Sequence, residues 1–200
     1  MIETRRDRKG RRIVTDSAAR ERVDEIFLQW QTERPDIDPI PVRIYGLIGR
    51  IHIQSTAFID EVLAPYNLVR GTFDVLTALR RAGAPYCLTP KELTKHLLLS
   101  GAGLNSRINK LETLHYIARL PEPNDRRTVR IQLTAAGEAV INQAIPIVFE
   151  AQWDRMKLLG PASQKQLVEE LIRFADAIDS SNSDVSIQQF AHGDDGQESA

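Results

Sequence analysis

The sequence predicts a mainly α-helical fold that carries one small β-hairpin. Long segments repeat apolar residues every three or four positions, which is typical of amphipathic helices. One short segment, 128–133, alternates polar and apolar residues, which is typical of a strand. A content of 42% hydrophobic residues in a chain of 200 is enough for a buried core. No stretch approaches the roughly 18 consecutive apolar residues of a membrane span.

Two helices are expected in the N-terminal third of the chain. Apolar residues at helical spacing, among them Trp30, predict the first helix over residues 17–32. Three prolines between residues 35 and 41 interrupt this pattern, because proline inside a helix removes a backbone hydrogen bond. The second helix, predicted over residues 42–63, is long enough to serve as a scaffold.

Two shorter helices follow. The first begins at residues 71–74 and ends at residues 80–83, where two arginines and a glycine favour helix termination. The second begins after Thr89, whose hydroxyl can cap it. Pro90 suits the first helical position, and Glu92 completes a capping box.

A glycine-containing turn at residues 100–103 separates this short helix from another, expected over residues 104–117. Amides, a hydroxyl and a cation held on one face of a helix suit the base edges and phosphates of a major groove. The expected buried face carries Leu104, Ile108, Leu111, Leu114 and Ile117, and the polar face carries Asn105, Ser106, Asn109 and Lys110.

A hairpin is expected next. Its return strand is the alternating segment 128–133, and its tip, residues 122–127, contains turn-forming residues and the adjacent arginines Arg126 and Arg127. An arginine at a hairpin tip can enter a minor groove, where the negative potential is strongest. Two short helices followed by a basic hairpin therefore predict a DNA-binding module.

The charge distribution supports this interpretation better than the net charge does. The whole chain has a net charge of −1, which argues against nonspecific coating of nucleic acid. Residues 89–130 carry eight Lys or Arg against four Asp or Glu, whereas residues 131–200 carry four against eleven. Basic charge is thus concentrated in the predicted DNA-binding segment.

The C-terminal part predicts two long helices, over residues 134–159 with a kink near Pro146 and over residues 161–178. Their apolar stripes need a partner surface, and a second copy of the chain is the economical one. The alternative is that they pack only on the core of their own chain. The stripe of the last helix consists of Leu167, Val168, Leu171, Phe174, Ala175 and Ile178.

No motif for catalysis or for cofactor binding is present, so the chain is not expected to be an enzyme. Cys87 is the only cysteine, and the four histidines (His52, His96, His115 and His192) lack metal-ligand spacing. We therefore expect no metal site and no cofactor. The charged N-terminus is not followed by an apolar segment, so a cytoplasmic location without a secretory signal is expected.

Several short motifs carry a family resemblance. They are FDVL at 73–76, LTP at 88–90 with Glu92 and Leu93, SRI at 106–108 with Leu111 and Glu112, DRR at 125–127, and IQLT at 131–134 with Gly137. Over about residues 40–180 the chain resembles the MarR family of bacterial transcription regulators, and the DRR motif of the wing is the most specific part of the match.

The resemblance implies a homodimer with a winged helix-turn-helix in each subunit. Such a dimer usually represses genes beside its own and releases a palindromic DNA operator when a small anionic or aromatic ligand binds. A winged-helix adaptor that binds protein and not DNA is the alternative, although the basic wing argues against it.

The resemblance also implies a domain plan. The basic N-terminal segment and the polar C-terminal segment lack apolar periodicity and are expected to be disordered. The expected parts are a disordered arm (1–16), one MarR-type domain (17–179) with a DNA-binding lobe (about 70–134) and dimerisation helices (about 17–64 and 134–179), and a disordered tail (180–200).

By motif position, the resemblance assigns roles on DNA to seven residues. Most family members have a glycine where His115 stands, so the end of the preceding helix departs from the family pattern. The implied contacts are Asn105, Ser106 and Asn109 with bases, Lys110 with phosphate, Arg127 with the minor groove and Arg126 with DNA at the wing, with Asp125 bracing the wing.

The additional N-terminal helix resembles the urate-responsive branch of the family. In that branch the matching positions, here Trp30, Asp74, Arg107 and Arg119, form the ligand pocket. Trp30 could stack on a flat heterocycle, the two arginines could pair with an anion, and Asp74 would be repelled by it. Another aromatic or heteroaromatic acid is the main alternative ligand, and Trp30 could instead belong to the core. An oxidant sensor is a weaker candidate, because Cys87 lies outside the N-terminal helices.

Overall fold

The computed structural model describes residues 4–6, 12–14, 17–97, 103–122 and 125–191. For 4–6, 12–14, 17–19, 122, 125–127 and 181–191 it describes the backbone alone. The chain divides into two compact units, Met1–Val148 and Phe149–Ala200.

The N-terminal segment contains two short strands, β1 (Thr4–Arg6) and β2 (Arg12–Val14), which pair in antiparallel register. The prediction of a wholly disordered arm over residues 1–16 is therefore wrong for these six residues. Segments of three residues can pair with each other, although they are too brief to show hydrophobic periodicity.

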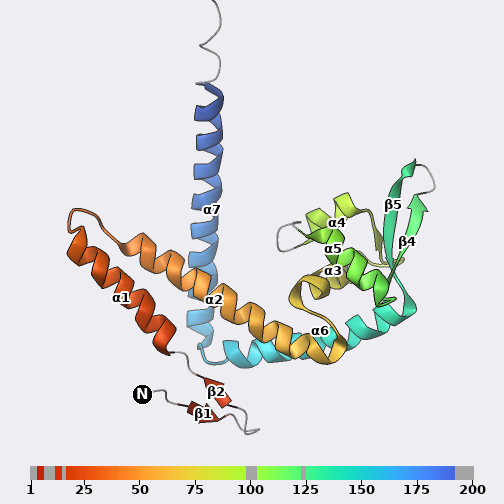
Figure 1. The fold of residues 1–200 in the computed structure, drawn as a ribbon, viewed down its shortest axis with the longest axis horizontal. Coiled ribbons are helices and arrows are strands. Elements are labelled where there is room, and N and C mark those ends of the chain that lie inside the picture. The colour runs from red at the N-terminus through yellow and green to blue at the C-terminus, as the bar shows by residue number, and fades with distance from the viewer. Residues whose placement is uncertain (1–3, 7–11, 15–16, 98–102, 123–124, 192–200) are drawn as a thin grey trace, which may run out of the picture. The chain divides into compact units, whose positions relative to one another are not determined.

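Two helices follow, α1 (Ser17–Glu33) and α2 (Ile40–Leu63), as predicted to within two residues at each end. The helix α1 packs against the first part of α2 (Figure 1). The guanidinium of Arg43 on α2 lies 5.3 Å from the centre of the Phe27 ring and 2.8 Å from a carboxylate oxygen of Asp24, both on α1. The helix α2 begins before its predicted start because Pro41 is tolerated in a first turn.

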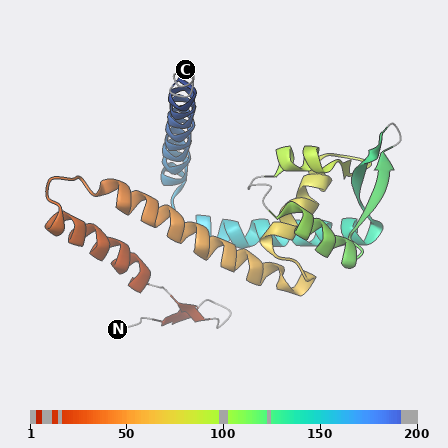
Figure 2. The ribbon, with the colours of Figure 1, turned by 45° about the horizontal axis from the view of Figure 1, so that its top comes forward.

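The lobe after α2 contains α3 (Arg70–Arg81), α4 (Pro90–His96) and α5 (Leu104–Thr113), preceded by the short 3₁₀ helix η1 (Ala64–Tyr66). These helices lie beside a three-stranded antiparallel sheet (Figure 2). The strands are β3 (Cys87–Leu88), β4 (Ile117–Glu122) and β5 (Asp125–Leu133), in the order β3-β5-β4. The predicted capping box of α4 is confirmed: the Glu92 amide donates to the Thr89 hydroxyl, and the Thr89 amide donates to the Glu92 carboxylate.

The core of the lobe is built from one face of each helix and the inner positions of the sheet. An additional polar contact fixes the start of α3, where the backbone amide of Arg70 donates to Oδ1 of Asp60 on α2 at 2.6 Å. The fully buried large side chains include Leu63, Leu68, Leu76, Leu79, Leu93, Ile108, Leu111, Ile131, Ile141 and Val148.

The end of α5 corrects a prediction. The helix ends at Thr113 and not at Ile117, which is instead the first residue of β4. His115 adopts φ +58°, its amide donates to the carbonyl of Glu112, and the next amide, of Tyr116, donates to the carbonyl of Leu111. These two bonds form a Schellman motif, in which the left-handed position is usually glycine. The apolar spacing continues through Ile117 because the strand also buries that residue.

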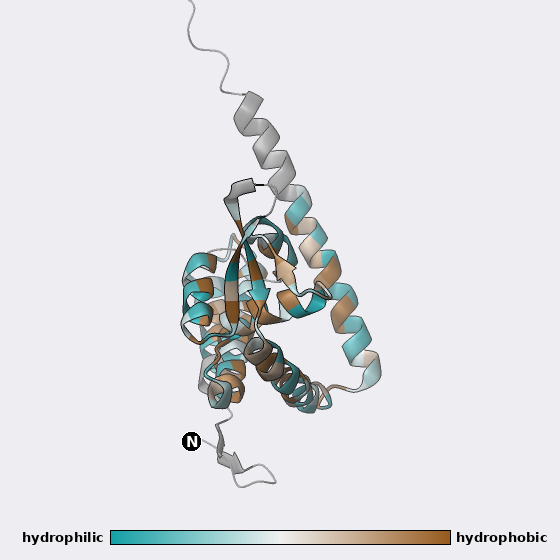
Figure 3. Cartoon of the chain, turned by 90° about the vertical axis from the view of Figure 1, so that its right-hand side faces the viewer, coloured by the Kyte–Doolittle hydropathy of each residue, from teal (hydrophilic) through white to brown (hydrophobic). Residues whose placement is uncertain are grey.

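The helix α6 (Ala135–Met156) agrees with its predicted range and contains Pro146. The last helix, α7 (Pro161–Ala191), extends well beyond the predicted end at 178, so the tail prediction of disorder over 180–200 is wrong up to residue 191. Residues 162–192 contain neither proline nor glycine, so no residue forces the helix to stop once it has formed. Figure 3 shows hydrophobic and hydrophilic residues interspersed along the coloured part of α7. None of the helices in the described ranges is long and apolar enough to cross a membrane.

Gly137 provides a test of the packing between α6 and the α5–β4 turn. A Cβ atom at this position would overlap the backbone carbonyl oxygen of Tyr116, which cannot rotate away as a side chain could. We expect Gly137→Ala to destabilise the protein by about 3 kcal/mol, the upper part of the usual range for overpacking. Thermal and urea denaturation followed by circular dichroism would measure this.

Gly49→Ala is the matched control, because a Cβ atom at Gly49 meets no atom of the described residues within 4 Å apart from the backbone of its own helix. We expect this helical position to gain up to about 1 kcal/mol from alanine. Equal stability of the two variants would contradict the described contact of Gly137.

Candidate functional site

The helix α5 presents one buried face and one exposed polar face. Its side chains Leu104, Ile108 and Leu111 are buried in the core of the lobe. The predicted exposure of the other face is confirmed, because Asn105, Ser106, Asn109 and Lys110 are all exposed. Whether these four side chains contact DNA stays a prediction.

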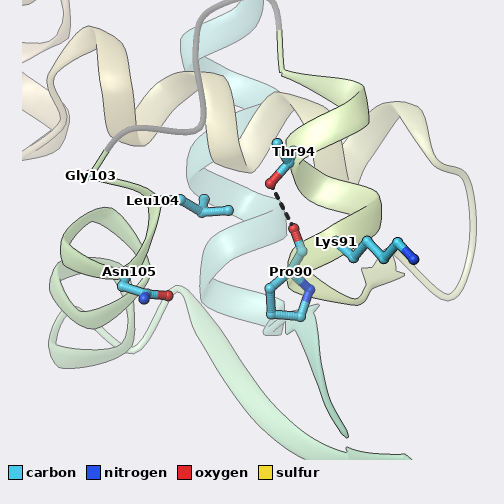
Figure 4. A pocket seen from close by; sticks show the side chains of 6 residues that line it. All are labelled: Pro90, Lys91, Thr94, Gly103, Leu104 and Asn105. Atoms are coloured by element: carbon cyan, nitrogen blue, oxygen red, sulfur yellow. Dashed lines mark hydrogen bonds between the residues drawn. The ribbon is translucent and has the colours of Figure 1, made fainter. Parts of the chain in front are cut away.

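An open depression of about 480 Å³ lies between α4 and the first turn of α5 (Figure 4). Lys91 and Thr94 line this depression and are exposed polar groups near Asn105. The sequence analysis did not predict a role for either residue. The spacing of the capping box could have indicated them, because a helix that starts at Pro90 places Lys91 in its first turn. Its lining consists of Pro90, Lys91, Thr94, Gly103, Leu104 and Asn105.

Arg119 on β4 contacts the exposed side of α5 in two places. Its Nη1 atom lies 3.2 Å from Oε2 of Glu112. Its Nη2 atom donates a hydrogen bond of 2.5 Å to Oδ1 of Asn109. One planar guanidinium therefore bridges two residues that lie three positions apart on the helix.

Asp74 on α3 is a buried carboxylate, 8% exposed. Burial raises its pKa above the ordinary value, and the nearby cations Arg70, Arg107 and Arg81 oppose this shift without cancelling it. Within the described part of the chain, Oδ2 of Asp74 accepts no hydrogen bond. A buried carboxylate oxygen without a hydrogen-bond partner destabilises the fold, so its presence here requires an explanation.

Arg107 on α5 packs against the start of α3. A Cβ atom on Gly71 would lie 2.8 Å from Nε of Arg107, so any side chain there would require the guanidinium to shift. The Nη1 atom of Arg107 is buried and, among the described residues, has no hydrogen-bond partner. Asp74 and Arg107 therefore hold opposite charges, each with one unused polar atom, on two helices that pack together.

The structure brings some of the predicted residues together and leaves others apart. Asp74 and Arg107 interact electrostatically, and Arg119 is engaged with the outer face of α5. Trp30 lies on α1, where its side chain is 48% exposed, so it is not part of the core of this chain. The side chains of Asp125, Arg126 and Arg127 lie outside the described ones, although their backbone belongs to β5.

The pKa of Asp74 predicts a pH dependence of stability. Because the pKa is higher in the folded than in the unfolded chain, the carboxylate destabilises the fold as pH rises through the folded pKa, and has no such effect below its unfolded pKa. We therefore expect Asp74→Asn to raise the melting temperature at neutral pH, on the order of 2–4 °C, and to change it little near pH 4, about the unfolded pKa of an aspartate.

Melting curves of the wild type and the variant across this pH range would test the sign. Asp154→Asn, at an exposed carboxylate paired with Lys157, is the matched control and should show no such trend. A difference between Asp74→Asn and wild type that does not change with pH would contradict the role of burial.

The chain is similar to known transcription regulators. Residues 66–128 match the MarR family. The HTH-type transcriptional regulator PecS of Dickeya dadantii is 36% identical over 144 residues, which are 72% of this chain and 85% of PecS. The multiple antibiotic resistance protein MarR of Escherichia coli is 32% identical over 102 residues, which are 51% of this chain and 69% of MarR.

A solved structure extends the similarity to the fold. A mutant MarR from E. coli complexed with operator DNA superimposes with a TM-score of 0.56 and 26% identity, covering 71% of this chain and 96% of that one. The predicted winged helix fold, mainly helical with a small antiparallel sheet, is confirmed by this likeness. These relatives are DNA-binding transcription regulators and not enzymes. Because these relatives are matched over most of their length at more than 30% identity, the chain belongs to the MarR family of transcriptional regulators.

Proposed function

We propose that this regulator is a cytoplasmic homodimeric repressor that binds a palindromic operator and releases it when a small planar anion binds. The observation that carries the ligand part is the pair of unused, buried polar atoms on Asp74 and Arg107, at the contact between α3 and α5. The DNA part rests on the exposed polar face of α5. The dimer part rests on apolar residues that the single chain leaves exposed.

Exposed apolar side chains are concentrated on the helices that would form the dimer. On α7, Leu167, Val168 and Leu171 are 42%, 55% and 51% exposed, and α1 and α2 also expose large apolar residues. Contiguous exposed apolar surface on a water-soluble chain marks an interaction site. A second copy that covers these helices would give the two-fold symmetry that a palindromic operator requires.

In the proposed DNA complex, α5 lies in the major groove. Asn105, Ser106 and Asn109 contact base edges, and Lys110 contacts a phosphate. Lys91 stands at the neighbouring depression and is suited to a further phosphate contact. By family position, Arg126 and Arg127 at the wing contact the minor groove, with Asp125 bracing them.

The proposed effector is urate or another aromatic or heteroaromatic acid. Its negative charge pairs with Arg107 and Arg119, and it repels Asp74, which already carries a raised pKa. Trp30 has a half-exposed indole available for stacking on a flat ring. Asp74 and Arg107 lie where α3 meets α5, so an anion between them would displace α5. The two α5 helices of the dimer would then no longer match two successive major grooves of the operator.

Fluorescence anisotropy on the upstream DNA of the gene, at fixed salt, tests the function as a whole. We expect tight binding that weakens steeply with salt, and release by urate or by an aromatic acid from a small panel. Absence of duplex binding at every salt concentration would favour the adaptor function. Binding that ignores urate but responds to an aromatic acid would keep the site and change the ligand.

Arg127→Ala tests the wing. We expect at least about a tenfold loss of operator affinity and a fall of about one in the salt slope for each lost contact, with unchanged melting. Arg173→Ala, which removes an exposed arginine paired with Glu170 on α7, is the control and should leave operator affinity unchanged. Unchanged affinity of Arg127→Ala would remove the wing from the interface.

Trp30→Ala tests the ligand response. We expect the effector concentration for half release to rise by about 3–10-fold, the equivalent of one aromatic stacking interaction, while DNA affinity stays the same. Trp153→Ala removes another half-exposed indole, on α6, and serves as the control. If the two variants respond to the effector alike, Trp30 has no part in the ligand site.

A further inference from the structure

We propose that Arg119 is a positioning residue for base reading. It fixes the side-chain amide of Asn109 so that the amide nitrogen, and not the oxygen, faces the DNA. Asn109 would then donate to the N7 acceptor of a purine. This inference rests on the proposed placement of α5 in the major groove.

The direction of the amide follows from chemistry alone. A guanidinium has only donors, so the Asn109 atom that receives the 2.5 Å bond from Nη2 of Arg119 must be the amide oxygen. The amide nitrogen then lies on the other side of the amide group. Since Asn109 is exposed, this nitrogen is available to a partner outside the chain.

The guanidinium that holds the amide is itself held. Nη1 of Arg119 lies 3.2 Å from Oε2 of Glu112, so β4 contributes one group that bridges two positions of α5. A lysine could not replace it, because one ammonium group on a flexible chain does not bridge two partners in a fixed plane. The clamp formed by Asn109, Glu112 and Arg119 therefore needs an arginine.

The clamp limits which base Asn109 can read. Two-point recognition of adenine by asparagine uses the amide oxygen to accept from the N6 amine and the amide nitrogen to donate to N7. In this structure the oxygen already accepts a charge-assisted bond. The oxygen has a second lone pair, so an adenine amine would have to share it with the Arg119 guanidinium, which weakens the bond to adenine. We therefore expect the bond from the amide nitrogen to an acceptor to dominate the preference.

The test uses the full-length protein without effector and its own operator, with duplexes that each change one base pair. Asn109→Ala identifies the base pair at which the preference depends on Asn109. At that position, replacing the purine by its 7-deaza analogue should weaken wild-type binding about three- to tenfold, the range of one hydrogen bond. Removing a 6-amino group there should have no comparable effect.

Arg119→Lys is the decisive variant, since it keeps the charge and removes the bridge. We expect the preference at that base pair to fall to within about twofold, with other positions and the salt slope unchanged. Adding Asn109→Ala should change nothing further at that position. Glu112→Gln, which leaves Arg119 in place but weakens its anchor, should shift the preference in the same direction. Arg81→Lys, the same exchange on α3, should leave all preferences intact.

The outcomes distinguish failure of the positioning role of Arg119 from failure of the proposed DNA interface. If Arg119→Lys retains the wild-type preference, or if loss of a 6-amino group costs as much as loss of N7, the positioning role is wrong while the interface stands. If Asn109→Ala changes no preference at any base pair, Asn109 does not read bases and the proposed interface fails at that residue. Selective loss in both variants at one shared base pair supports the proposal.

Discussion

The burial of Leu104, Ile108 and Leu111 against the core is the constraint on which the DNA-binding lobe depends. A helix of ten residues is marginal in water by itself, so its orientation is set by the apolar face that it buries. With that face fixed, the helical period alone puts Asn105 and Asn109 toward solvent. The same packing leaves Arg107 at the boundary between the two faces, where its guanidinium lies over Gly71 and near Asp74. The packing of the core and the position of the polar site therefore both follow from the helical pattern of apolar residues in α5.

Much of this could be predicted from the sequence, because the strongest signals are local. Capping at Thr89, the helical periods and the alternation in β5 each depend on neighbours in the chain. The strand β3 could not be found this way: it has two residues and exists only because β5 pairs with it. The end of α5 was missed because Ile117 continues the helical spacing while belonging to a strand.

The residues of the candidate site show the same division. Exposure of the polar face of α5 follows from periodicity, and family motifs marked Asp74 and Arg107. That Arg119 contacts Asn109 could not be deduced, since it depends on how β4 crosses α5 ten residues later. Likewise, no sequence pattern shows that the side chain of Arg107 packs against Gly71. Both positions depend on contacts between elements that lie apart in the sequence, and local sequence patterns do not predict such contacts.

The two arginines of the proposed ligand set differ in how strongly an anion would act through them. Arg119 and Glu112 are 37% and 41% exposed, and an exposed ion pair of this kind contributes about 0–1 kcal/mol. Asp74 is buried, where charges interact more strongly than at the surface. In the proposed mechanism, an anion beside Arg107 would therefore interact more strongly with its surroundings than one beside Arg119, and its repulsion of Asp74 would be the step that moves α5. Competition for Arg119 would add a smaller effect, by releasing Asn109. Each tenfold loss of operator affinity needs only about 1.4 kcal/mol, so in this proposal the buried pair would drive the release and the exposed clamp would modify the sequence preference.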